Sequence, residues 1–178
     1  KKEGPMEYAE IVRLAELAPP FSTMIDPDYP GFYNPLDMPA AIDTFCRQSG
    51  QPTPSGFGPT ARTILEGLDL KYKMVLNQLE LTTGRKINTI HIIGGGARNQ
   101  LLCQFTANAT GRRVVSGPDE ATATGNILVQ AISLGYIGSL ADARKVVNES
   151  FDLKEYLPED RSEWELAYKK FEKIAKPS

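Results

Sequence analysis

Apolar residues recur at steps of three and four through much of the chain, the spacing that places them on one face of an α-helix. The clearest case covers residues 59–83. One side of this helix is expected to face a core and the other, charged side to face solvent. The apolar side carries Ala61, Leu65, Leu68, Tyr72, Val75, Leu76 and Leu79, and the polar side carries Arg62, Glu66, Asp69, Lys73, Asn77 and Glu80.

Shorter helices are expected wherever the same spacing recurs between proline and glycine breakers. They cover residues 6–17, 40–49, 99–110, 120–134 and 158–174, and a further helix opens at a capping pair formed by Ser139 and Asp142. Residues 19–39 hold six prolines and predict a loop whose order comes from aromatic side chains that fold back on the body. Those aromatic residues are Phe21, Tyr29, Phe32 and Tyr33.

Two short β-branched segments, residues 89–93 and 113–116, predict buried strands on either side of the helix at 99–110. The order strand–helix–strand predicts a parallel βαβ unit. Two strands do not make a stable sheet, because three or more are usually required. The sequence therefore predicts that a partner chain, or an upstream part of the natural protein, completes the sheet.

The helix at 120–134 carries no charge after Glu120 and is apolar nearly all round. Asn126, Gln130 and Ser133 interrupt its apolar surface, whereas a membrane span needs about 20 predominantly apolar residues. We therefore expect a helix sandwiched between two layers of the protein, and no contact with a membrane.

Composition narrows the class of protein. Hydrophobic residues make up 41% of the 178 residues and charged residues 24%, as in soluble globular domains. The net charge of −2 gives no electrostatic basis for binding nucleic acid. Cys46 and Cys103 form no metal-binding or disulfide pattern, and this favours a reducing, cytoplasmic location. Lys1 is not an initiator methionine, so the start resembles a cut inside a longer chain.

One segment has a chemical signature: the predicted strand runs into Gly94, Gly95 and Gly96, and the next helix begins near Asn99. Bare backbone at the end of a strand lets a ligand approach closely, and a helix start directs amide N–H groups toward an anion. Two interpretations remain open from spacing alone. The turn is either a phosphate or nucleotide seat, or a tight turn for close packing of helix on strand.

Spacing separates the nucleotide-binding motifs. A P-loop is rejected because no lysine follows the glycines. A dinucleotide fingerprint fits poorly, because Asn99 stands where its third glycine belongs and Asp119 lies beyond the second strand. His91, the only histidine, is expected to be a hydrogen-bonded structural residue of the strand. Metal sites and Ser/His/Asp sites have no supporting cluster.

Three groups of residues together resemble the C-terminal domain of FGGY carbohydrate kinases, and among these the rhamnulokinases. They are residues 90–102 with the glycine turn, residues 111–126 with a second glycine series, and the proline-rich loop at 26–38. The resemblance implies an α/β fold: a helix-rich, partial ribonuclease-H-like domain of the actin and hexokinase type, with a short parallel βαβ unit and missing upstream strands. Residues 1–178 would form one C-terminal domain, comprising a proline-rich insertion at 19–58, a nucleotide-binding core at 86–136 and C-terminal helices at 139–178.

The resemblance also implies a function. The full-length enzyme would use ATP and Mg²⁺ to phosphorylate a ketose, L-rhamnulose, on its 1-hydroxyl, and this chain would supply one wall of the ATP site. Gly95 and Asn99 are the implied nucleotide-binding residues, with Gly94 and Gly96 as neighbours. The catalytic base, the sugar contacts and the phosphate loop would belong to the missing N-terminal part, so the chain alone is expected to be inactive. Alternatives are a kinase for xylulose, gluconate, fuculose or glycerol, or a non-catalytic interaction module, and copies could associate through the incomplete sheet.

Overall fold

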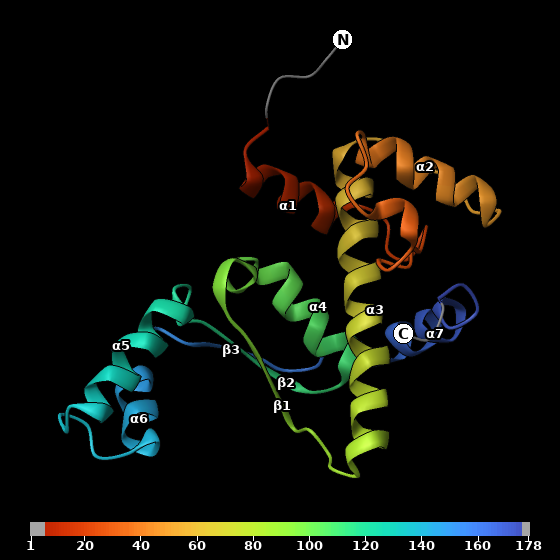
Figure 1. The fold of residues 1–178 in the computed structure, drawn as a ribbon. Helices are drawn as coiled ribbons and strands as arrows, with labels where there is room; N and C mark the ends of the chain where they lie inside the picture. Colours follow the sequence, from red (N-terminus) through yellow and green to blue (C-terminus); the bar gives the residue numbers. More distant parts are fainter. Residues whose placement is uncertain (1–5, 176–178) are drawn as a thin grey trace.

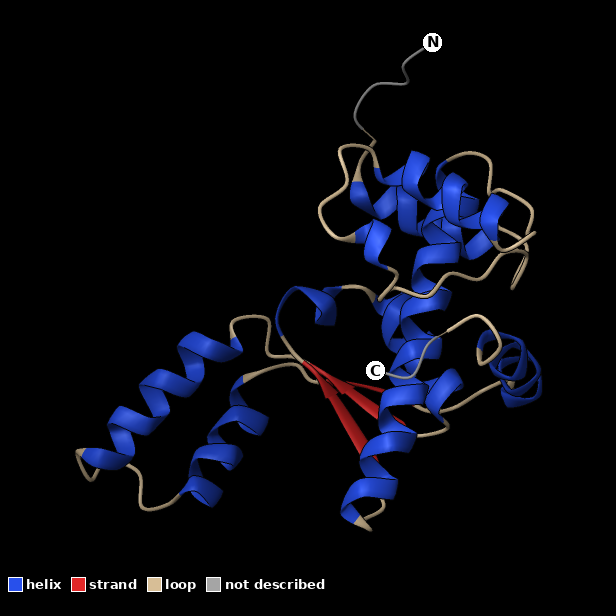
Figure 2. Ribbon diagram, turned by 45° about the vertical axis from the view of Figure 1, so that its right-hand side comes forward, coloured by secondary structure: helices blue, strands red, loops and turns tan. Residues whose placement is uncertain are grey.

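The computed structural model describes residues 6–175, which form helices around a small sheet (Figures 1 and 2). The expectation about Lys1 lies outside these residues. The α-helices are α1 (Tyr8–Leu17), α2 (Met38–Gln48), α3 (Phe57–Thr83), α4 (Gln100–Thr110), α5 (Ala121–Ser133), α6 (Leu140–Ser150) and α7 (Arg161–Phe171); the strands are β1 (Thr89–Ile92), β2 (Arg113–Ser116) and β3 (Lys154–Tyr156); two 3₁₀ turns are η1 (Pro30–Phe32) and η2 (Gly94–Arg98).

The parallel pairing of β1 with β2 is confirmed, with Ile90 opposite Val114. The expectation of only two strands is wrong, because β3 pairs antiparallel with β2 and places Glu155 opposite Val115. This third strand has three residues, too few for an alternating pattern to identify. Within the described residues the order is β1-β2-β3, so β1 lies at an open edge of the sheet.

Helix α3 is the long central helix of the molecule, and α1, α4 and α7 pack along it (Figure 1). The expected orientation of its faces is wrong. Glu66, Asp69 and Lys73 from the predicted polar side are buried, whereas Tyr72 from the predicted apolar side is 40% exposed. Helical spacing identifies two faces, but it does not tell which one is covered when helices pack on several sides.

Specific partners compensate the buried charges of α3. Glu66 accepts hydrogen bonds from Arg62 Nε at 2.6 Å and from the backbone N–H of Phe21 at 2.9 Å. Burial still raises the pKa of Glu66 above its ordinary value. Lys73 pairs with Glu165 at 2.6 Å and lies over the ring of Tyr168, so a cation inside the helix packing keeps two favourable contacts.

Asp69 is fully buried, and burial raises its pKa well above the ordinary value of 3.8. The Thr106 hydroxyl lies 2.5 Å from Asp69 Oδ1 and 2.8 Å from the carbonyl oxygen of Leu102. A hydroxyl has one hydrogen, and the carbonyl can only accept it. The hydroxyl can donate to only one of these two oxygens at a time, and its buried contact with Asp69 joins α3 to α4.

An aromatic core joins α3, α4 and α7. Trp164 makes ring contacts with Phe21 at 4.9 Å and Phe105 at 5.2 Å between centroids, and Phe171 has no exposed surface. The predicted folding back of the proline-rich loop is confirmed for Phe21, and also for Tyr29 and Phe32, which pack on α2. It is wrong for Tyr33, which is 91% exposed.

The expected burial of the uncharged helix is also wrong. Helix α5 buries none of its residues, and Ile127 is 66% exposed. Helix α5 packs on α6, and Figures 1 and 2 show this pair projecting from the sheet. A helix that is apolar nearly all round needs two covering layers, and the described residues supply one. No helix in the described part of the chain combines the length and apolar character required to cross a bilayer.

The raised pKa of Asp69 makes stability depend on pH. A folded-state pKa raised above 3.8 gives a contribution that is complete below this value and is lost as the pH rises toward the folded pKa. The free energy of unfolding should therefore fall by at most about 1.4 kcal/mol per pH unit from about pH 4 upward on account of this group. Asp69→Asn, which keeps the shape without the charge, should reduce that slope.

Denaturant titrations at several pH values test this expectation, with the exposed Asp152→Asn as the matched control. An Asp69→Asn protein with the slope of the parent would show that folding does not raise the pKa of Asp69.

Candidate functional site

The glycine turn follows β1 and is joined to the loop after β2. The backbone N–H of Gly117 donates to the carbonyl oxygen of Ile92 at 2.9 Å, and that of Gly94 donates to Pro118 at 3.3 Å. Gly94 has a φ of +70°, a left-handed conformation that glycine adopts without strain. The carboxyl ends of both parallel strands therefore meet in one surface, where α/β sheets place ligands.

The three glycines have different surroundings. A Cβ atom on Gly95 would meet no atom within 4 Å, so its backbone faces open space. A Cβ atom on Gly96 would lie 3.4 Å from Ile92 Cγ2, in contact with the strand. Gly95 therefore leaves room for a ligand, as the first interpretation requires. Gly96 allows close packing of helix on strand, as the second interpretation requires.

Asn99 lies between the 3₁₀ turn η2 and helix α4, and it is 5% exposed. Its Oδ1 accepts a hydrogen bond from the backbone N–H of Leu102 at 3.0 Å, the geometry of a helix N-cap. One of the amides that was expected to face an anion is therefore already satisfied. This end of α4 is less suited to a phosphate group than the sequence indicates.

The other end of the Asn99 amide contacts α1. Asn99 Nδ2 donates to the Tyr8 hydroxyl oxygen at 2.9 Å, although 91 positions separate the two residues. A cavity of about 530 Å³ lies beside this contact, between α1 and the start of α4. Sequence reasoning missed Tyr8, because no local pattern marks a contact over this separation. The cavity is lined by Tyr8, Val12, Arg13, Arg98, Asn99 and Gln104, among others.

Arg98 also lines a second cavity, which is bordered by further charged side chains. Arg98 Nε and Asp119 Oδ2 form an ion pair at 2.7 Å, and this pair raises the pKa of Arg98. Asp152 and Lys154 complete a cavity of about 310 Å³ together with the loop after β2. Asp119, whose position argued against a dinucleotide-binding role, is thus engaged with the residue beside Asn99.

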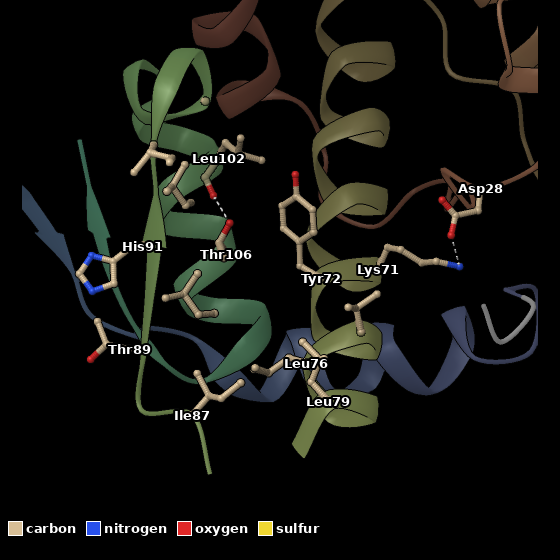
Figure 3. Close-up of a pocket in the computed structure, with 15 residues that line it drawn as sticks. Asp28, Lys71, Tyr72, Leu76, Leu79, Ile87, Thr89, His91, Leu102 and Thr106 are labelled. Atoms are coloured by element: carbon tan, nitrogen blue, oxygen red, sulfur yellow. Dashed lines mark hydrogen bonds and ion pairs between the residues drawn. The ribbon is translucent and has the colours of Figure 1, made fainter. Parts of the chain in front are cut away.

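A third cavity, of about 750 Å³, runs along the open edge of β1, opposite α3 (Figure 3). Tyr72, Leu76 and Leu79 from the half-exposed face of α3 line one side of it. His91 projects from β1 on the side away from α3 in Figure 3, and its side chain is exposed, so the expected role as a hydrogen-bonded structural residue does not fit. This apolar trough borders the open edge of β1, where a neighbouring strand of the sheet would lie.

The two cysteines have a structural role in the core. Cys46 and Cys103 are fully buried, and burial raises the pKa of the Cys103 thiol to about 11, so this thiol is neutral near pH 7. The described residues include no group of three or more histidine, cysteine or acidic side chains arranged to hold a metal ion.

Comparison with known proteins gives a consistent result. Residues 5–134 match the FGGY family of carbohydrate kinases, C-terminal domain. The chain is 46% identical over 165 residues to a rhamnulokinase of Bacteroides thetaiotaomicron, covering 93% of this chain and 34% of that protein. It is 40% identical to a rhamnulokinase of Enterococcus faecalis, covering 84% of this chain and 31% of that protein.

The fold also matches a solved structure. The gluconate kinase of Lactobacillus acidophilus superposes with a TM-score of 0.69 at 15% identity, covering 97% of this chain and 35% of that one. This likeness supports the expected fold, a partial domain of the actin and hexokinase type. The chain spans about a third of the length of the curated relatives it matches.

The contrast between Gly94 and Gly95 gives a direct test of the turn. Gly94→Ala should lower the free energy of unfolding by about 1–2 kcal/mol, because its φ of +70° disfavours a side chain. Gly95→Ala should change it by less than about 0.5 kcal/mol, because its Cβ meets open space. Chemical denaturation of both variants measures the difference, and equal losses would contradict the described turn.

Proposed function

Because the chain belongs to the FGGY family of carbohydrate kinases, we propose that it forms one wall of the ATP site in an ATP-dependent sugar kinase. The observation that carries this proposal is 46% identity over 93% of the chain to a rhamnulokinase. The reaction would transfer the γ-phosphoryl group of ATP to the 1-hydroxyl of L-rhamnulose, giving ADP and L-rhamnulose 1-phosphate.

The glycine turn supports the nucleotide-binding role. Gly95 offers backbone with open space in front of it, and Asn99 lies four residues further on, at the start of α4. Gly94 and Gly96 hold this turn against the loop after β2 and against β1. ATP would lie across this surface, with Gly95 in contact and with Asn99 beneath.

Phosphoryl transfer depends on positioning, on neutralisation of charge and on a base that acts with them. This chain contributes positioning alone in our proposal. The base, the sugar contacts and the groups around the phosphates would come from the rest of a polypeptide as long as the relatives. The described residues include no group of three or more histidine, cysteine or acidic side chains that could hold Mg²⁺ without further ligands.

Two surfaces are suited to covering by that remaining polypeptide. The open edge of β1 and the trough beside Tyr72 and Leu79 would receive further strands. The exposed apolar face of α5 would receive a second layer. A second copy of the chain on the β1 edge is the alternative occupant.

The two unpaired cysteines agree with a cytoplasmic location.

Experiments can distinguish this proposal from two other functions. A kinase for another sugar would use the same glycine turn, so the sugar specificity rests on the rhamnulokinase relatives alone. A non-catalytic interaction module would leave the turn without a ligand.

The chain by itself should show no ATP consumption dependent on L-rhamnulose, because the base is proposed to lie elsewhere. A coupled assay for ADP with the purified 178-residue chain measures this, with a rhamnulokinase of full length as the positive control. Sugar-dependent turnover by the chain alone would show that the catalytic base lies within it.

In the full-length polypeptide, Gly95→Val should raise the KM for ATP about tenfold or more, corresponding to about 1.4 kcal/mol of lost binding. The KM for L-rhamnulose and the unfolding temperature should stay near those of the parent, because the new side chain fills space outside the fold. Gly95→Ala should give a smaller change in the same direction.

A panel of L-rhamnulose, xylulose, gluconate, fuculose and glycerol in the same assay identifies the sugar. An unchanged KM for ATP in Gly95→Val would overturn the nucleotide site. Preference for another sugar would overturn the rhamnulokinase assignment and keep the nucleotide site.

A further inference from the structure

A cavity of about 600 Å³ lies among α1, α2 and the start of α3. These elements are grouped at one end of the molecule in Figures 1 and 2. None of the residues that line this cavity belongs to the glycine turn or to the cavity beside Tyr8. Cavities of about 300–1,000 Å³ are typical of small-molecule sites. The cavity is therefore a candidate site that the proposed wall of the ATP site does not use.

The walls of this cavity are held in place by contacts outside it. The Gln51 side chain accepts a hydrogen bond from the backbone N–H of Met24 and donates one to the carbonyl oxygen of Met24, both at 2.9 Å. These two bonds fix the start of the segment that forms one wall. Helices α1 and α3 lie in direct contact, because a Cβ atom on Gly58 would lie 2.6 Å from the Leu14 carbonyl oxygen. The cavity is therefore pre-formed, as small-molecule sites usually are.

Four polar side chains that line the cavity form no hydrogen bond or ion pair within residues 6–175. They are Asp43, Thr53, Ser55 and Thr60. The hydroxyl of Thr44, which follows Asp43 on α2, by contrast donates to a backbone carbonyl oxygen of its own helix at 2.9 Å. One carboxylate and three hydroxyls are thus available to a ligand in a single cavity.

The other walls are apolar, and they restrict the class of ligand. Ile11, Ala61 and Ile64 form part of them, and the ring of Phe57 is 41% exposed. Asp43 is the only charged residue among those that line the cavity, so a phosphate or carboxylate group would be repelled. A sugar carries hydroxyls that donate to a carboxylate and also accept from hydroxyls, and its C–H face gains from burial against apolar side chains. An organic ammonium ion can only donate, so it would use the three hydroxyls as acceptors alone.

We propose that this cavity binds an uncharged monosaccharide, with Asp43 and Thr60 hydrogen-bonded to its hydroxyls and Phe57 packed against its C–H face. The inference goes beyond the proposed function and does not depend on it, because none of these residues belongs to the glycine turn. L-Rhamnulose is the probe, since the proposed function makes it the sugar that the protein would encounter. L-Rhamnulose 1-phosphate should bind more weakly, because its phosphate group carries the same sign of charge as Asp43.

The test is a methyl NMR titration of the full-length polypeptide with L-rhamnulose in the absence of ATP. The methyl signals of Ile11 and Ile64, which line the cavity, should shift in a saturable manner, and that of Ile174 in the aromatic core should not. Asp43→Asn and Thr60→Val keep the shapes of the side chains. Each should raise the Kd about three- to tenfold, the effect of one lost hydrogen bond.

Glu149→Gln is the matched control, because it removes one carboxylate from an exposed position of α6. It should leave the Kd measured at Ile11 and Ile64 unchanged. Unfolding temperatures close to that of the parent would show that Asp43→Asn and Thr60→Val act on binding and not on folding.

The outcomes separate this inference from the proposed function. Signals of Ile11 and Ile64 that stay in place at sugar concentrations saturating for turnover would overturn the sugar site and leave the kinase proposal intact. Equal Kd values in the parent, Asp43→Asn and Thr60→Val would also overturn it. Tighter binding of L-rhamnulose 1-phosphate, or of 1,4-diaminobutane, would overturn the assignment to an uncharged sugar. A protein without kinase activity whose Ile11 and Ile64 signals respond to the sugar would overturn the proposed function alone.

Discussion

The parallel pairing of β1 with β2 is the constraint on which the candidate site depends. Because both strands point the same way, their carboxyl ends meet at one edge, and the hydrogen bond from Gly117 to Ile92 joins the two following loops. The glycine turn, the Asn99 cap and the Arg98–Asp119 pair all lie beyond that edge. Helix α4, which connects the strands, is held in turn by the buried contact between Asp69 and Thr106.

Burial in this chain follows the packing of several helices around α3 and not a simple division into apolar and polar faces. Glu66, Asp69 and Lys73 lie inside because each finds a partner there, whereas Tyr72 and Leu79 border a trough. The exposed face of α5 and the open edge of β1 have the same character: each is apolar or unpaired on a side that the described residues leave uncovered. A chain that spans a third of its relatives would show such surfaces.

Short sequence patterns correctly predicted the structural features that depend on neighbouring residues alone. The strand at β2, the glycine that ends α4 and the Ser139 cap of α6 all lie where β-branching, left-handed glycine and side-chain capping place them. Gly94, Gly95, Gly96 and Asn99 are candidates from a contiguous motif, and they lie together in the turn between β1 and α4. The face of α3, the short β3 and the contact from Tyr8 to Asn99 depend on partners far away in the sequence, and no periodicity contains them.

The uncovered edge of β1 has a practical consequence for work with this chain. A strand with unpaired backbone N–H and C=O groups on one side is a template for adding strands from other molecules. Here the template lies beside apolar side chains of α3. Recombinant production of these residues alone would therefore favour aggregation at high concentration, and a fusion partner that covers the β1 edge would improve solubility.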